Sequence, residues 1–170
     1  MSKQVKNAKF EFTGETKVFL GVTLNRIRAV AAIAAFGVAA GDLGGWIERE
    51  ENLQVSGDAW VYGDAWVYGD ARVSGNARVS GDAQVYGNAR VETVNITATR
   101  TDGYTFLVAP TPDGPRIIAG CRYFTFKEAK AHWKETRGGS RLGDESLAIV
   151  KHLETMAKLN GFDKPVKGAA

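Results

Sequence analysis

The side chains that could perform acid–base or nucleophilic chemistry lie in the C-terminal third of the chain. The only histidines are His132 and His152, and the only cysteine is Cys121. A cysteine nucleophile needs its thiolate, which a neighbouring imidazole such as His132 could stabilise. Glu128 and Glu135 stand four residues before and three residues after His132, so a helix would let either carboxylate orient its ring. A solvated His132 and a core Cys121 explain the same residues without catalysis.

A set of aspartates recurs in the middle of the chain, each directly after a glycine. A ladder of such carboxylates on one edge could hold a cation. These aspartates are Asp58, Asp64, Asp70 and Asp82. Gly-Asp pairs are also typical of turns, in which the aspartate bonds its own backbone. The glycines recur every six residues and lead into no helix, which excludes a phosphate-binding loop. We expect no metal site and no cofactor.

Residues 55–91 repeat one six-residue phrase almost without variation. Val opens each copy from Val55 to Val91, Gly follows two places later, Asp or Asn comes next, and Ala closes the copy. Each Ala and the Val two residues after it face the same side of a strand, and the Gly pair supplies a tight corner. A period this short predicts a solenoid, in which repeats stack because none can bury an apolar side alone.

Two resemblances follow from these residues. The phrase resembles the hexapeptide repeat of left-handed β-helix proteins, which implies left-handed winding and a triangular coil of roughly eighteen residues. From Gly41-Asp-Leu-Gly-Gly-Trp-Ile-Glu48 through Glu51-Asn-Leu53 to the repeats, the chain resembles small proteins encoded by tailed phages and prophages. They share a Thr-Leu-x-Arg-Ile-Arg stretch, here Thr23 to Arg28, and the match covers roughly residues 10–91. The resemblance implies a viral protein working inside a bacterium.

In such a coil, residues eighteen apart lie one above another around an aliphatic interior. Val55, Val73 and Val91 would form one column. We expect residues 37–54 to form an irregular first coil, with Ile47 and Leu53 in register with the Ala positions and a polar excursion at residues 48–52. A stack this short has open ends that need caps.

The outward side chains are the candidate binding residues, because Trp, Tyr and Arg together are typical of interface hot spots. They are Trp60, Tyr62, Trp66, Tyr68, Arg72, Arg78, Tyr86 and Arg90. Stacking would place Trp60 above Arg78 in cation–π contact. The other expected pairs are Trp66 above Gln84, Tyr68 above Tyr86, and Arg72 above Arg90. Such faces could join copies of the chain, dock a host protein or hold a small nucleotide.

The flanking segments predict different structures. Residues 1–36 are rich in strand-forming residues and predict a β-rich cap. The apolar run 29–40 is too short to span a bilayer and predicts a buried segment. Residues 92–170 predict a small α+β module, with a first helix opened by the capping box of Thr125 and Glu128 and a second capped by Asp144.

Enzymes of the hexapeptide-repeat kind carry their catalytic histidine on the coils, and a related zinc class carries several histidines there. Residues 47–91 contain no histidine. We therefore expect no enzymatic activity. A hexapeptide acyltransferase with an unusual base is the alternative, and a minor virion structural or assembly protein is another.

Charge and composition narrow the possible partners. The net charge is +3, but residues 51–115 carry four basic and eight acidic side chains, whereas residues 116–170 carry eleven and six. The acidic middle argues against a phosphate track for nucleic acid. A single cysteine allows no intrachain disulfide, which fits a reducing cytosol. The start Met-Ser-Lys-Gln-Val-Lys has no apolar core, so we expect no signal peptide and no membrane partner.

Together these features predict a mainly β protein. It would be a short left-handed parallel β-helix (residues 37–91) with an N-terminal β-rich cap (1–36) and a small C-terminal α+β module (92–170). We expect a homo-oligomer, with a trimer favoured, in the host bacterial cytoplasm. The expected function is non-enzymatic binding of a host component, most specifically inhibition of a bacterial defence system in an anti-CRISPR-like or nucleotide-signal-sequestering manner.

Overall fold

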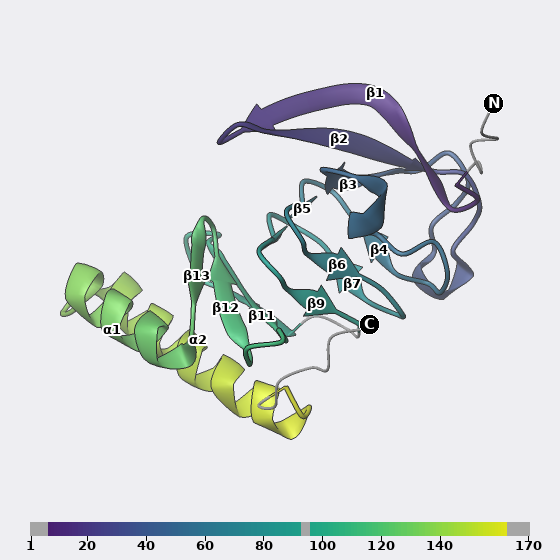
Figure 1. Ribbon diagram of the computed structural model, residues 1–170. Coiled ribbons are helices and arrows are strands. Elements are labelled where there is room, and N and C mark those ends of the chain that lie inside the picture. The colour runs from purple at the N-terminus through teal and green to yellow at the C-terminus, as the bar shows by residue number, and fades with distance from the viewer. Residues whose placement is uncertain (1–6, 93–95, 163–170) are drawn as a thin grey trace.

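The computed structural model describes residues 7–92 and 96–162, which form three joined parts (Figure 1). An antiparallel hairpin comes first, a solenoid of short strands follows, and a sheet with two helices ends the described chain. As the sequence predicts, the fold is mainly β with few helices.

The solenoid is built from two-residue strands, each consisting of the residue after Ala and the following Val. They are β4 (Trp60–Val61), β5 (Trp66–Val67), β6 (Arg72–Val73), β7 (Arg78–Val79), β8 (Gln84–Val85) and β9 (Arg90–Val91). Strands eighteen residues apart pair in parallel: β4 with β7, β5 with β8, and β6 with β9. Every repeat Ala from Ala59 and every repeat Val from Val61 is buried in the interior. The expected eighteen-residue stacking is therefore confirmed for these strands.

Glycine is required at the corners for two physical reasons. The corner glycines from Gly57 to Gly87 all have positive φ, which other residues adopt only with strain. At the first corner the next coil also approaches closely, since a Cβ on Gly57 would lie 2.6 Å from the carbonyl oxygen of Gly75. The repeat therefore keeps Gly in every copy.

The first coil is two residues longer than the coils after it. Leu53 bridges to Val73, twenty residues on, whereas β4 pairs with β7 at a spacing of eighteen. Because Gln54 N donates to Val73 O while Gly57 faces Gly75, the extra residues are Val55 and Ser56. The prediction that Val55 joins the Val73 column is wrong. Leu53 takes that place, and Val55 remains 45% exposed.

The expected register of Ile47 and Leu53 in the first coil is also wrong, for the same reason. Strand β3 (Leu43–Ile47) pairs with β5 so that Ile47 lies beside Val67. Ile47 and Leu53 therefore continue the Val columns and not the Ala positions. The polar excursion between them is a 3-10 turn, η2 (Glu50–Asn52).

The N-terminal strands extend one side of the solenoid. Strand β1 (Phe10–Phe19) pairs antiparallel with β2 (Val22–Ala29), and β2 pairs antiparallel with β3. The resulting five-stranded sheet has the order β1-β2-β3-β5-β8. Figure 1 shows the hairpin arching over the first coil. Phe10 and Ile27 belong to the buried core of the solenoid.

The apolar run 29–40 is not a buried segment, contrary to the prediction. It forms a loop with a 3-10 turn, η1 (Ala34–Phe36), closed by a bridge between Ile33 and Val38. Only Ala29, Ile33 and Val38 are buried. The alanines stay exposed because one methyl group costs little to leave in water.

The C-terminal module is an antiparallel meander with two helices. Its strands are β10 (Ile96–Thr99), β11 (Thr105–Ala109), β12 (Arg116–Ala119) and β13 (Arg122–Phe124), and its helices are α1 (Phe126–Arg137) and α2 (Arg141–Leu159). The predicted capping box of Thr125 and Glu128 is confirmed. Ser140 and not Asp144 caps α2, because the two-glycine turn is tight and the helix starts earlier. Within the described ranges, neither helix combines the length and apolar character that crossing a membrane needs.

The sheet of this module separates two apolar cores. On one side, Leu107, Ala109 and Ile118 pack into the core of the solenoid. On the other side, residues such as Phe106 and Ile117 pack against the helices. The core of the solenoid thus includes residues from all three segments, and the domain boundaries at 36 and 91 stay a prediction.

The register of the first coil can be tested with two substitutions two residues apart. Leu53→Ala should lower the free energy of unfolding by about 2–5 kcal/mol, because it leaves a cavity in a packed column. Val55→Ala should change it by less than about 0.5 kcal/mol, because Val55 lies outside the column. Urea unfolding followed by circular dichroism measures both, and equal losses would contradict the two-residue insertion.

A buried lysine holds the inserted residues in place. Lys9 Nζ donates to Gln54 O at 3.0 Å and to Gly57 O at 3.1 Å, and the residue is only 5% exposed. Burial, partly opposed by Asp58, lowers the pKa of Lys9 to about 8.

Lys9 should make stability increase with pH. Between pH 8 and about pH 10 the unfolded chain still binds the lysine proton, while the folded chain releases it near its pKa of about 8. The free energy of unfolding should therefore rise from pH 7.5 to pH 9.5, as measured by urea unfolding. Lys9→Met should reduce this rise and leave the part due to Lys17, whose pKa burial also lowers. An unchanged rise in that variant would sink the assignment. Above about pH 10 the buried tyrosines act in the opposite direction.

Candidate binding faces of the solenoid

The coil distributes the eight candidate binding residues over three faces. We name them the aromatic face (outward side chains along β3, β5 and β8), the arginine face (along β6, β9 and η2) and the loop-covered face (along β4 and β7). Residues six apart lie on different faces, and residues eighteen apart adjoin. Trp66, Tyr68 and Tyr86 lie on the aromatic face, Arg72 and Arg90 on the arginine face, and Trp60, Tyr62 and Arg78 on the loop-covered face.

The loop-covered face offers no exposed tryptophan, contrary to the prediction. Trp60 pairs with Arg78 as expected but is completely buried. Its Cζ2 lies only 2.8 Å from the position that a Cβ on Gly44 would occupy, so the missing side chain makes room for the indole. The guanidinium of Arg78 stacks on Tyr62 at 4.6 Å and not on Trp60. Tyr62 in turn donates to Phe36 O at 3.3 Å.

The aromatic face begins with a lysine held between two tryptophans. Lys17 Nζ lies 4.1 Å from the ring centres of both Trp46 and Trp66. Phe19 packs edge-on against Trp66 at 4.8 Å. Cation–π contacts of this kind hold the hairpin on the solenoid. Sequence reasoning missed Lys17, Phe19 and Trp46 because they precede the repeats.

Tyrosines continue this face as far as the C-terminal module. Tyr68 and Tyr86 stack at 5.1 Å with ring planes only 10° apart, as their spacing predicts. Tyr86 contacts Tyr123 of β13 at 5.4 Å, and Phe19 contacts Tyr68 at 6.4 Å. These rings therefore join all three parts of the protein.

Burial suppresses acid–base chemistry on the aromatic face. It raises the pKa of Tyr68, Tyr86 and Tyr123, and at Tyr86 the neighbouring tyrosines and Cys121 raise it further. Tyr123 donates a hydrogen bond to Asn88 Oδ1 at 2.7 Å. The Tyr86 hydroxyl is buried and has no partner among the described residues.

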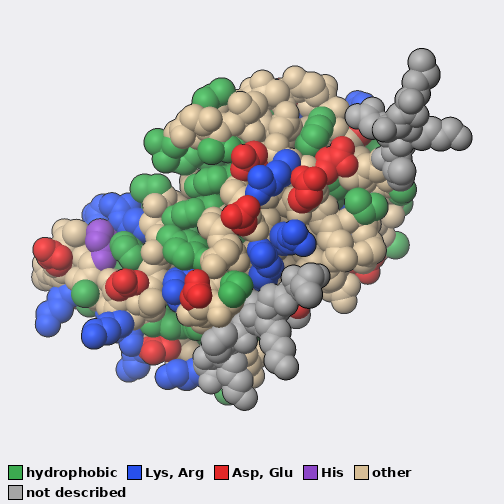
Figure 2. Space-filling view, viewed as in Figure 1, with side chains coloured by type: hydrophobic (Ala, Val, Ile, Leu, Met, Phe, Trp, Pro, Cys, Tyr) green, Lys and Arg blue, Asp and Glu red, His purple; other side chains and the backbone are tan. Residues whose placement is uncertain are grey.

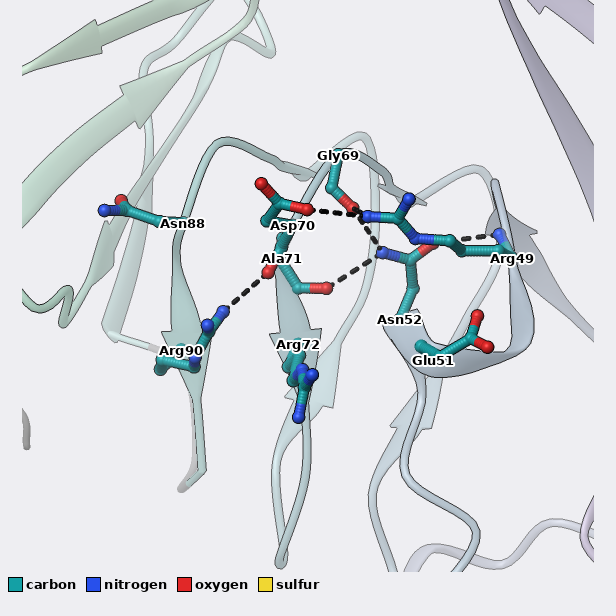
Figure 3. A pocket seen from close by; sticks show the side chains of 9 residues that line it. All are labelled: Arg49, Glu51, Asn52, Gly69, Asp70, Ala71, Arg72, Asn88 and Arg90. Carbon is teal, nitrogen blue, oxygen red and sulfur yellow. Dashed lines mark hydrogen bonds and ion pairs between the residues drawn. The ribbon is translucent and has the colours of Figure 1, made fainter. Parts of the chain in front are cut away.

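The arginine face is organised by a buried asparagine (Figure 3). Asn52 Nδ2 donates to the carbonyl oxygens of Gly69 at 3.1 Å and Ala71 at 2.9 Å. Its Oδ1 accepts from the backbone N–H of Arg49 at 2.9 Å. Arg49 Nη2 then donates to Gly69 O at 2.6 Å and to Asp70 Oδ1 at 2.8 Å. The Asn52 side chain thus links the first coil to the next coil at this corner. It also fixes the backbone of Arg49.

Two hollows lie beside Arg72 and Arg90, which adjoin on paired strands. The hollows measure about 590 and 580 Å³, and both are lined by Glu51, Arg72 and Arg90. Arg90 Nη1 donates to Asp70 O at 2.6 Å. Among the described residues, Arg72 has no hydrogen bond or ion pair, so its guanidinium is available to a partner.

The potentially catalytic residues are engaged elsewhere. His132 Nε2 accepts a hydrogen bond from Arg122 Nε at 2.9 Å, so this nitrogen does not face Cys121 as a base. Glu128 bonds Thr125 in the capping box and does not orient His132. Cys121 is exposed and not a core residue, contrary to the simpler interpretation.

The corner aspartates form no cation ladder in the part of the chain that the structure describes. Asp64 pairs with Arg26 at 3.5 Å and Asp70 with Arg49 at 2.8 Å. No group of three His, Cys, Asp or Glu side chains there could hold a metal ion. The turn role predicted for these aspartates accounts for their positions.

Comparison with known proteins agrees with the architecture. A family model described as the YdcK beta solenoid repeat matches residues 53–69, 71–83 and 83–93. These segments span β4 to β9, so the chain is a β-solenoid repeat protein. No curated protein matches the chain.

The unpaired hydroxyl of Tyr86 gives a test of the tyrosine stack. Tyr86→Phe should leave the free energy of unfolding unchanged or raise it by up to about 1 kcal/mol, because it removes a buried polar group without a partner. Tyr86→Ala should lower it by about 3–5 kcal/mol through loss of packing. Thermal unfolding by calorimetry checks both variants. A clear loss in Tyr86→Phe would show that the hydroxyl has an acceptor.

Proposed function

We propose that this protein acts by binding a partner and not by catalysis, and that the arginine face is the surface it uses. The observation that carries the proposal is the placement of Arg72 beside Arg90 on paired strands, next to two hollows. Like charges on adjacent strands destabilise a sheet unless something compensates them. Asp70 already pairs with Arg49, so Arg72 fits a carboxylate supplied by the partner.

The chemistry of arginine suits this role. A guanidinium binds a carboxylate through two parallel hydrogen bonds, and arginine is enriched among the residues that dominate interface energies. The strands of the solenoid hold the arginines on a rigid backbone, so little ordering cost arises on binding. Glu51, which lines both hollows, would select against a partner whose carboxylates are misplaced.

The aromatic face suits contact between copies of the chain. Figure 2 shows hydrophobic side chains in a band from the tip of the hairpin, across the solenoid, towards the C-terminal module. At the hairpin tip Val18 and Leu20 are strongly exposed. We infer a trimer of left-handed coils packed side by side, the arrangement that the hexapeptide resemblance implies.

The biological setting follows from the resemblance of residues 10–91 to phage and prophage proteins. A phage protein that works by binding would act on a host component in the bacterial cytoplasm. The most specific form of the proposal is an inhibitor of a bacterial defence system, which would block a host protein or sequester a signalling nucleotide. The rigid, charged arginine face would be the blocking surface.

Substitution on two faces at the same repeat position tests the docking surface. Tagged protein should capture a host protein from bacterial lysate, and Arg72→Glu should reduce capture at least about tenfold because it reverses a central charge. Arg78→Glu, at the same position on the loop-covered face, should retain capture. Capture should also weaken as salt is raised.

Light scattering on the same samples provides the control for assembly. Wild type and both variants should have the same trimeric mass, so that loss of capture reports the face and not the oligomer. Equal capture by Arg72→Glu and wild type would overturn the arginine face as the docking surface. A monomeric wild type would overturn the trimer.

A further inference from the structure

A separate pocket of about 310 Å³ lies in the C-terminal module, between the β10–β13 sheet and α1. No residue of the solenoid lines it, and it shares no residue with the two hollows of the arginine face. Its lining residues are Arg100, Asp102, Tyr104, Arg122, His132, Trp133, Thr136 and Arg137. With three arginines and one carboxylate, this pocket carries more net positive charge than either hollow of the arginine face.

One arginine in the pocket is already neutralised. Arg100 donates to Asp102 through Nε at 2.8 Å and Nη2 at 2.7 Å, and its Nη1 donates to Ser146 Oγ at 2.8 Å. These bonds hold the pKa of Asp102 at about 2, so the carboxylate is charged at neutral pH. The pair serves as a rigid wall and leaves the other two arginines uncompensated.

Arg122 and Arg137 have no ion pair with a carboxylate within the described ranges. Arg122 instead donates through Nε to His132 Nε2 at 2.9 Å. Burial and then the charge of Arg122 lower the pKa of His132, against a smaller opposing effect of Glu135. The imidazole is therefore neutral at pH 7 and accepts from Arg122, which directs the guanidinium. Two arginines in one pocket without neighbouring carboxylates favour the binding of an anion there.

Trp133 and Thr136 form further parts of the pocket wall. Trp133 lines the same pocket, is 3% exposed and has an indole Nε1 with no acceptor among the described residues. Leaving such a donor unpaired costs about 1–3 kcal/mol. Thr136 adds a hydroxyl to the lining, already bonded to His132 O at 2.7 Å. An anion with several acceptor oxygens would offset the excess charge of Arg122 and Arg137.

We propose that this pocket binds the phosphate group of a small molecule, held by Arg122 and Arg137. A phosphate offers more acceptor oxygens than a carboxylate and matches the fork of each guanidinium. The volume lies at the lower end of the range for ligand sites, which leaves room for a small organic group beside the phosphate. Tyr104 supplies an aromatic wall for that group.

The NMR signals of the two histidines test this site in one sample, because His132 lines the pocket and His152 serves as the control. In an NMR titration with inorganic phosphate at constant ionic strength, the His132 signals should shift and its pKa should rise, because a bound anion favours the imidazolium. His152, exposed on α2, should not respond. Adenosine monophosphate is the second probe, and tighter binding than inorganic phosphate would assign the ligand as a phosphate ester.

Charge-removing variants locate the anion. Arg137→Gln should weaken phosphate binding about tenfold, the loss expected for one charge-assisted contact, and its exposed position leaves the fold intact. Arg141→Gln removes an equal charge at the start of α2, where Arg141 pairs with Glu145 at 2.6 Å, and should change nothing. The proposal fails if His132 and His152 shift equally, if neither shifts, or if acetate binds as tightly as phosphate.

Discussion

A stack of coils joined by parallel hydrogen bonds between residues eighteen apart cannot bury its own two ends, and the rest of the structure depends on closing them. The interior of Ala and Val is narrow, and even the face of β3, β5 and β8 has only three strands of the solenoid itself. Ile27 and Ile33 of the N-terminal segment and Leu107 and Ile118 of the C-terminal sheet join the buried core of the solenoid. Repeats without such caps would expose apolar columns to water. The hairpin and the C-terminal sheet thus share one apolar core with the solenoid.

The same spacing decides what the surface can recognise. Along the chain, tryptophans, tyrosines and arginines alternate within a few residues and suggest one mixed patch. In space, successive strands lie on different faces and every third strand returns to the same face. Tyr68 therefore stacks on Tyr86, while Arg72 adjoins Arg90. Aromatic packing energy is thereby separated from unpaired positive charge. In the function proposed above, one face would hold copies of the chain together and another would stay open to a partner.

Sequence reasoning succeeded where structure is local and periodic. The strands and corner glycines follow from the six-residue phrase, the stacked pairs from the eighteen-residue coil, and the Thr125 capping box from four neighbouring residues. It failed where a distant segment decides. Val55 matches the repeat phrase in full, yet Leu53 occupies the column because two residues bulge beside it. Trp60 matches the outward positions, yet Gly44 makes space for it under the N-terminal loop. The pocket around Arg122 depends on strand β13, a short strand that no periodic signal marks.

Strand β13 connects the two proposed sites physically. Successive side chains on a strand point to opposite faces, so Tyr123 packs against Tyr86 of the solenoid while Arg122 reaches His132 on the helical side. Tyr123 also donates to Asn88 at 2.7 Å, and Asn88 lines the hollow beside Arg90. Contiguity alone does not couple two sites, because coupling requires an element with two arrangements that each ligand favours differently. An anion that draws Arg122 away from His132 would change the side-chain arrangement on β13, and the Tyr123–Asn88 bond would carry that change to the arginine face.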